Sequence, residues 1–102
     1  MKLVKKLPEH KRAKTLIVGA GVGGRIVVKE IQSHPELGYE ILGFIDDDQK
    51  KLHRRFHGVE VIGTVFDIPA VVDRFEIKAV IICIPSASGE INRNIVARCE
   101  ES

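Results

Sequence analysis

The sequence predicts an α/β fold in which a doubly wound parallel sheet carries helices on both faces. Four short apolar runs rich in β-branched residues alternate with segments of helical periodicity, and such runs are typical of strands buried on both faces. A glycine-rich turn follows the first run directly and opens the first helical segment. With 102 residues, the chain suits a single domain but is short for a complete dinucleotide-binding fold.

The apolar runs define the predicted strands, which span residues 15–18, 41–45, 59–64 and 79–84. Counted along the chain, their expected order in the sheet is 3-2-1-4, with the topological switch between the first and fourth strands. Helices on both faces then give three layers, αβα. A full version of this sheet has one or two more strands, so the sequence indicates a truncated, Rossmann-type domain cut from a longer protein.

Helical periodicity predicts helices over residues 22–33, 67–75 and 89–101. Asp67 is a plausible N-cap of the second helix, and Pro69 in its first turn costs no hydrogen bond. Ser86 or Ser88 would cap the third helix. Residues 47–58 are expected to connect the second and third strands mainly through loops.

The glycine-rich turn predicts a binding site for the pyrophosphate of a dinucleotide. Gly19 permits the tight turn, Gly21 leaves the backbone uncrowded, and Gly24 lets the helix pack close to the sheet. Free N–H groups and the helix dipole then favour an anion at this point. The predicted cofactor-binding residues of the turn are Gly19, Ala20, Gly21, Val22, Gly23 and Gly24.

An acidic residue stands where such folds bind the ribose of the adenosine. Asp46 ends the second predicted strand, 22 residues after Gly24, and its carboxylate can accept hydrogen bonds from a ribose and would repel a 2′-phosphate. This position favours NAD(H) over NADP(H). We include Asp47 among the candidate cofactor-binding residues, although Asp47 and Asp48 are also typical turn formers. The alternative is that the glycines only end a strand and the aspartates only cap a loop.

The exit of the fourth predicted strand completes the predicted site. Pro85, Ser86, Ala87 and Ser88 would lie beside the glycine turn at the switch point, where small side chains leave room for a ligand. The serine hydroxyls could donate to a phosphate or to the nicotinamide ribose. They could equally cap the following helix.

Charge is unevenly distributed along the chain. Residues 1–14 contain six basic residues and one acid, whereas the whole chain has a net charge of +2, too small to indicate nucleic acid binding. This segment suits either a tether beside anionic lipid or a solvated leader. We therefore divide the chain into a basic leader, residues 1–13, and an NAD(P)-binding Rossmann-like domain, residues 14–102.

The remaining features predict neither a membrane span nor a catalytic site. The longest apolar run, 79–84, is far shorter than a membrane span, and Cys83 and Cys99 in apolar surroundings favour a reducing, cytoplasmic location. His53 and His57 have zinc-like spacing without a third ligand. Residues 50–55 could contact phosphates, although a solvated loop is favoured. Tyr39 has no lysine four residues later, so no catalytic residue is assigned.

Six blocks of the sequence closely resemble the N-terminal nucleotide-binding domain of CapD-like polysaccharide biosynthesis proteins, and they span residues 16–21, 34–39, 43–48, 57–59, 63–64 and 84–88. These proteins are membrane-associated nucleotide-sugar epimerases or dehydratases. The fold is also similar to CoA-binding domains and to the NADH-sensing domain of Rex repressors. The resemblance implies a juxtamembrane, cytosolic position for residues 1–14 and nucleotide-site roles for Gly19, Gly21, Gly24, Asp46 and residues 85–88. The chain lacks the family's membrane helices and catalytic domain, so the resemblance implies no dehydratase or epimerase activity for it alone.

Three hypotheses follow. The first is a non-catalytic NAD(H)-binding module, regulatory or structural, from an enzyme of polysaccharide synthesis. The second is the cofactor-holding half of an oxidoreductase or nucleotide-sugar enzyme. The third is an interaction module without a ligand, dimerising through its edge strand or last helix. CoA or a nucleotide-sugar is also a possible ligand, because a glycine turn recognises a pyrophosphate and not what is attached to it.

Overall fold

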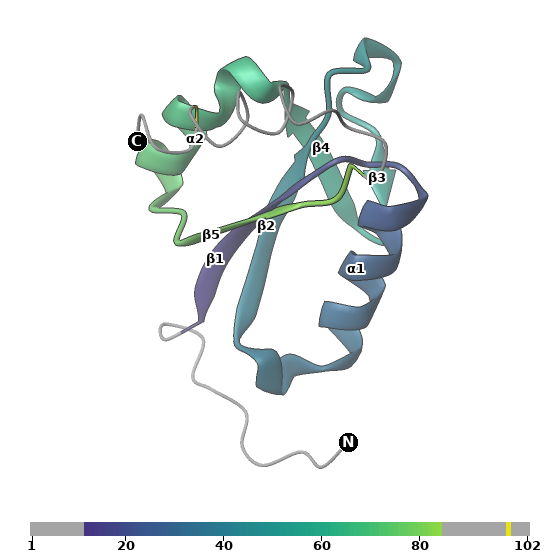
Figure 1. Cartoon of the computed structure of the whole chain (residues 1–102), viewed down its shortest axis with the longest axis vertical. Helices are drawn as coiled ribbons and strands as arrows, with labels where there is room; N and C mark the ends of the chain where they lie inside the picture. Colours follow the sequence, from purple (N-terminus) through teal and green to yellow (C-terminus); the bar gives the residue numbers. More distant parts are fainter. Residues whose placement is uncertain (1–11, 85–97, 99–102) are drawn as a thin grey trace.

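The computed structural model describes residues 12–84 and 98, which form a five-stranded sheet between two helices (Figure 1). The sheet order is β3-β4-β2-β1-β5. The helices are α1 (Val22–Ser33) and α2 (Ile68–Phe75), and three 3-10 turns are η2 (Pro35–Leu37), η3 (Gln49–Lys51) and η4 (Val65–Asp67). The strands are β1 (Ala13–Val18), β2 (Tyr39–Ile45), β3 (Arg55–Phe56), β4 (Val59–Gly63) and β5 (Ala79–Ile82).

Four of the strands are parallel and follow the predicted order. The four apolar runs of the sequence form four neighbouring strands, in the order β4, β2, β1 and β5. All three pairings between them are parallel. At the centre, Ile17 of β1 pairs with Phe44 on one side and Ile81 on the other. The α/β class is confirmed. The carboxyl ends of β1, β2 and β5 therefore meet at one edge of the sheet, where the glycine turn begins.

The fifth strand was not expected from the sequence. β3 lies within the stretch predicted as loops and pairs antiparallel with β4 through Arg55–Glu60 and Phe56–Val59. His57 and Gly58 between them both have positive φ, 54° and 79°, which suits a two-residue hairpin turn. A strand of two residues has no recognisable alternation, so the prediction missed it.

Alternation along β1 divides the core between the two helices. Leu16 and Val18 pack in one cluster with Ile68 of α2, whereas Ile17 packs in the other with Val28 of α1. All five side chains are at most 1% exposed. Successive residues of a strand face opposite sides of a sheet, so one strand anchors both outer layers.

The boundaries of the two described helices match the prediction, and one side-chain bond at the start of α2 differs from a usual cap. α1 covers residues 22–33 as expected, and Pro69 lies in the first turn of α2. Asp67 does not cap α2 with its side chain. Its Oδ2 instead accepts hydrogen bonds from the N–H of Thr64, at 2.8 Å, and from the Thr64 hydroxyl, at 3.3 Å. Asp67 is therefore the N-cap residue of α2, as predicted, but its carboxylate bonds the preceding 3-10 turn and not the helix.

Several predicted segments lie outside the described residues. These are most of the basic leader, the 85–88 turn and the third predicted helix apart from Arg98, whose guanidinium lies 4.1 Å from the centre of the Phe66 ring. Within residues 12–84 and 98, no helix has the length and hydropathy needed to cross a membrane.

Candidate functional site

The glycine turn lies between the carboxyl ends of β2 and β5. The N–H of Gly19 donates to the Ile45 carbonyl, and the N–H of Cys83 donates to the Val18 carbonyl, each at 2.7 Å. Gly19 has φ +107°, and a Cβ there would lie 2.6 Å from the Cys83 carbonyl oxygen. Only glycine fits both the backbone conformation and the space, as the tight turn requires.

The other two glycines of the motif differ in the space around them. A Cβ on Gly24 would overlap the carbonyl oxygen of Gly19, so Gly24 allows α1 to start against the turn. A Cβ on Gly21 would meet no described atom within 4 Å. Nothing in the described fold therefore requires glycine at position 21, whose φ of −85° and ψ of −164° suit any residue. Open space beside the backbone is what a bound phosphate needs.

The first turn of α1 presents backbone N–H groups without a side-chain cap. Gly21 is the N-cap and has no side chain to bond them, and the first turn contains no acidic residue. The first hydrogen bond of the helix runs from the N–H of Arg25 to the Gly21 carbonyl, at 3.0 Å. The N–H groups of Val22, Gly23 and Gly24 come before it and therefore have no helix carbonyl to bond. Together with the positive end of the helix dipole, these groups form an anion-binding geometry.

Asp46 holds the glycine turn through its carboxylate. Its Oδ2 accepts from the N–H of Ala20 at 2.8 Å, and its Oδ1 accepts from the N–H of Asp48 at 2.9 Å. The ammonium of Lys51 lies 3.7 Å from Oδ2, and the Asp46 side chain is 16% exposed. A carboxylate has about four lone-pair positions, so it can still accept from a ligand hydroxyl. Asp46 thus lies at the glycine turn, as predicted, but two of its bonds are internal.

Asp47 points to a different loop. Its Oδ1 accepts from the N–H of Val65 at 2.9 Å, which ties the end of β2 to the start of η4. Asp48 accepts from the N–H of Lys50 and caps η3. Both aspartates therefore have structural hydrogen bonds of the kind that turn-forming residues make. A ligand role for Asp47 stays a prediction.

Arg25 and Lys51 lie at the Asp46 side of the turn, and Arg54 shares an aromatic ring, Phe56, with Arg25. Arg25 Nε donates to the Ala20 carbonyl at 3.1 Å, and its guanidinium lies 4.2 Å from the centre of the Phe56 ring. The guanidinium of Arg54 lies 5.4 Å from the same ring centre. With Lys51 at Asp46, positive charge gathers beside the predicted ribose position.

An apolar groove runs along the other side of the turn. It has a volume of about 360 Å³ and is lined by Gly23, Val27 and residues 81–84. Burial raises the pKa of the Cys83 thiol. Residues 85–88, predicted to complete the site, follow directly in the chain but lie outside the described residues.

His53 and His57, which have zinc-like spacing, lie in different surroundings. His53 Nδ1 lies 3.1 Å from a carboxylate oxygen of Glu60, and His57 occupies the β3–β4 hairpin turn. Within the described part of the chain, no group of three or more His, Cys, Asp or Glu side chains could hold a metal ion.

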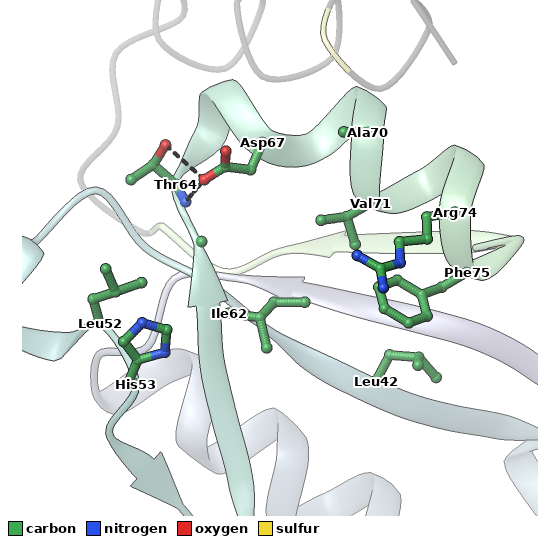
Figure 2. A pocket seen from close by; sticks show the side chains of 11 residues that line it. Leu42, Leu52, His53, Ile62, Thr64, Asp67, Ala70, Val71, Arg74 and Phe75 are labelled. Carbon is green, nitrogen blue, oxygen red and sulfur yellow. Dashed lines mark hydrogen bonds between the residues drawn. The ribbon is translucent and has the colours of Figure 1, made fainter.

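A second hollow, of about 570 Å³, lies between the sheet and α2, on the face opposite to α1 (Figure 2). Leu42, Ile62 and Val71 line its floor and wall. The Thr64 and Asp67 polar groups at its upper edge already bond each other. The hollow therefore offers apolar surface without the free N–H groups found at the glycine turn.

A family model described as a CoA-binding domain matches residues 1–102, the entire chain. The chain belongs to the CoA-binding domain family. Its glycine turn, with an open backbone and a helix N-terminus, is a geometry suited to a nucleotide pyrophosphate.

This CoA-binding domain is also similar to two polysaccharide biosynthesis proteins. It is 38% identical over 84 residues to the capsular polysaccharide biosynthesis protein CapD of Staphylococcus aureus, covering 78% of this chain and 14% of CapD. It is 39% identical over 74 residues to the probable polysaccharide biosynthesis protein EpsC of Bacillus subtilis (strain 168), covering 72% of this chain and 12% of EpsC. The resemblance noted in the sequence is confirmed: the chain is a nucleotide-binding domain related to these proteins, of whose length it spans a small part.

Two solved structures share the fold. The Rex-family repressor RSP in complex with β-NADH has a TM-score of 0.71 at 23% identity, covering 88% of this chain and 43% of RSP. UDP-D-quinovosamine 4-dehydrogenase from Vibrio fischeri has a TM-score of 0.74 at 24% identity, covering 86% of this chain and 72% of that one. At these identities the likeness shows the Rossmann-like fold of the CoA-binding domain.

Proposed function

We propose that this CoA-binding domain is a non-catalytic module that binds an adenine dinucleotide, with NAD(H) as the predicted ligand. In this proposal it serves as a regulatory or structural part of a nucleotide-sugar epimerase or dehydratase of polysaccharide synthesis. One observation carries the proposal. Asp46 fixes the backbone of Ala20 while the next residue, Gly21, faces open space at the start of α1.

The geometry suggests how the ligand lies. The pyrophosphate would accept hydrogen bonds from the N–H groups of Val22 and Gly23, because these have no acceptor within the helix. The adenosine ribose would then lie toward β2, where Asp46 is exposed enough to accept from one hydroxyl. The other half of the ligand would extend along the groove that Gly23 and Cys83 line.

Two of the comparisons support an adenine nucleotide, whereas UDP-D-quinovosamine 4-dehydrogenase, which shares the fold, is named for a nucleotide-sugar. The family is described as a CoA-binding domain, and RSP, which shares the fold, forms a complex with β-NADH. Both ligands contain adenosine and a pyrophosphate, the parts that the glycine turn and Asp46 would hold. A role within a sugar-modifying enzyme rests on the similarity to CapD and EpsC.

We propose no catalytic role for the residues of this domain. Asp46, the acid beside the glycine turn, is bonded to two backbone N–H groups and so serves binding and position. For the domain as a whole, three points stay predictions: a cytoplasmic location, a membrane-proximal position through residues 1–14, and a homodimer.

Isothermal titration of the purified domain with NADH tests the proposal, with CoA and a UDP-sugar titrated in parallel. We expect saturable binding of NADH or CoA at submillimolar concentrations and weaker binding of the UDP-sugar. Mass spectrometry of the native protein checks for a co-purified nucleotide that would block the titration. Absence of NADH and CoA binding at millimolar concentration, with no co-purified nucleotide, would contradict the proposal whether or not the UDP-sugar binds.

A further inference from the structure

Two arginines from different elements lie on one aromatic ring beside the glycine turn. Arg25 belongs to α1 and Arg54 precedes β3, and their guanidinium carbons are 4.2 and 5.4 Å from the centre of the Phe56 ring. Their charges are therefore within about 10 Å of each other, which is the Debye length at 0.1 M salt. Charges this close repel each other unless an anion lies nearby.

The neighbouring carboxylates do not supply that anion. Glu60 pairs with Arg55 and His53, and Asp46 is the partner of Lys51. Among the residues that the structure describes, neither Arg25 nor Arg54 forms an ion pair with a carboxylate. Lys51 lies at Asp46, Arg25 lies on the neighbouring Ala20, and Arg54 shares the Phe56 ring with Arg25. The corner formed by these three positive groups also contains the carboxylates of Asp46 and Asp48.

Ala20 places this corner next to the predicted ribose. Its N–H donates to Asp46 and its carbonyl accepts from Arg25 Nε, so the carboxylate and the guanidinium flank the same residue. A ribose hydroxyl at Asp46 would have Arg25 beside it. The terminal N–H groups of an arginine form a planar fork that suits phosphate oxygens.

We propose that Arg25, Arg54 and Lys51 form a second anion site, which binds a phosphate monoester on the ribose of the bound adenosine. This inference rests on the proposed nucleotide function and refines its ligand class. The sequence alone indicates that Asp46 disfavours such a phosphate. In the structure, two backbone N–H groups and Lys51 stabilise the charge of Asp46, and Arg25 lies at the adjacent Ala20 carbonyl.

The test compares ligands that differ only in this phosphate. NADPH is titrated against NADH, and CoA against dephospho-CoA, by calorimetry at low and high salt. We expect the phosphorylated member of at least one pair to bind about tenfold more tightly at low salt, as charge-assisted hydrogen bonds are strong. The advantage should shrink at high salt. Tighter binding of NADPH than of NADH shows that the site binds a 2′-phosphate. Tighter binding of CoA than of dephospho-CoA shows that it binds a 3′-phosphate.

A matched pair of variants locates the effect. Arg54→Gln and Arg55→Gln each remove one positive charge from adjacent positions, but Arg55 pairs with Glu60. Arg54→Gln should reduce the phosphate advantage several-fold and leave the affinity for NADH unchanged, whereas Arg55→Gln should change neither. The Arg25→Gln/Arg54→Gln double variant should abolish the advantage.

Equal affinities within both ligand pairs would overturn this inference while leaving the proposed function in place, provided that NADH or dephospho-CoA binds. An advantage that survives in the double variant would also overturn it. Failure of all four ligands to bind would contradict both.

Discussion

The carboxylate of Asp46 accepts a hydrogen bond from the N–H of Ala20 at 2.8 Å, joining residues that are 26 positions apart. The bond runs beside the one from Gly19 N–H to the Ile45 carbonyl, so the end of β2 holds two successive residues of the glycine turn. The acid that the sequence assigns to the ligand therefore also builds the turn that would hold the pyrophosphate.

Asp46→Ala should weaken both the fold and the binding site. The partly buried N–H of Ala20 and the exposed N–H of Asp48 would lose their acceptor, and the loss at Ala20 costs about 1–3 kcal/mol of the free energy of unfolding. We expect the Kd for NADH to rise at least tenfold because the turn loses its position. Urea denaturation and calorimetry measure the two effects. Asp48→Ala, at an exposed carboxylate, is the control, and equal Kd values for wild type and Asp46→Ala would refute the role of the bond.

Asp47→Ala should separate stability from binding. Its carboxylate bonds the N–H of Val65 on the far loop, and the substitution should lower the free energy of unfolding by about 1–2 kcal/mol. The Kd for NADH should change less than twofold, since the glycine turn keeps Asp46. A large loss of affinity at unchanged stability would instead assign Asp47 to the ligand.

Two adjacent glycines of α1 should respond in opposite directions to alanine. Gly24→Ala puts a Cβ against the carbonyl oxygen of Gly19, a backbone atom that cannot turn away, and should destabilise the domain by about 3 kcal/mol. Gly23→Ala places its Cβ 3.8 Å from the Cys83 carbonyl oxygen, an ordinary contact. It should stabilise the domain by up to about 1 kcal/mol, the helix preference of alanine over glycine. Thermal melts that show the same shift for both variants would contradict the packing described for Gly24.

The Cys83 thiol should react slowly. Because burial raises its pKa, less thiolate is present at pH 8 than for a free cysteine. In a Cys99→Ser background, alkylation of Cys83 by iodoacetamide should be slower than alkylation of glutathione and should accelerate as pH rises. Because the folded state holds the thiol proton more tightly than the unfolded state, the Cys83 pKa also makes the free energy of unfolding depend on pH. Its contribution is fully present below the ordinary thiol pKa, about 8.5, and is lost as pH rises through the folded-state pKa. A rate at pH 8 equal to that of glutathione would show that the thiol is accessible and unshifted.

The parallel part of the fold could be predicted because each strand is a continuous apolar run. β1 lies inside the sheet with residues 15–18 buried, and β5 at the end of the described sheet is half-buried; the β-branched residues of both runs indicate strands of a doubly wound sheet. β3 could not be predicted, since two residues, Arg55 and Phe56, give no periodic signal and depend on pairing with β4. Asp67 is the predicted N-cap residue of α2, but the direction of its side-chain bond could not be predicted, because a carboxylate at this position can bond either the following helix or the preceding turn.

The candidate site was predictable where local geometry defines it. The glycine spacing alone indicated the turn, the open backbone at Gly21 and the helix N-terminus. The bonds of Asp46 to Ala20 and of Asp47 to Val65 join distant residues, and a single sequence does not show such pairs. Arg25, directly after Gly24, carried a local signal as a cation at the turn, but its contact with Phe56 depends on the unexpected strand.

Substitution of Gly21 tests the central claim most directly. Gly21→Val introduces a side chain into space that the described fold leaves open, on a backbone conformation that valine adopts readily, so the melting temperature should stay close to that of wild type. Calorimetric titration with NADH compares this variant with wild type and with Lys29→Val, which adds the same side chain at an exposed position further along α1. We predict that Gly21→Val loses NADH binding while Lys29→Val retains it. A folded Gly21→Val domain that binds NADH as tightly as wild type would show that the pyrophosphate does not lie at the glycine turn.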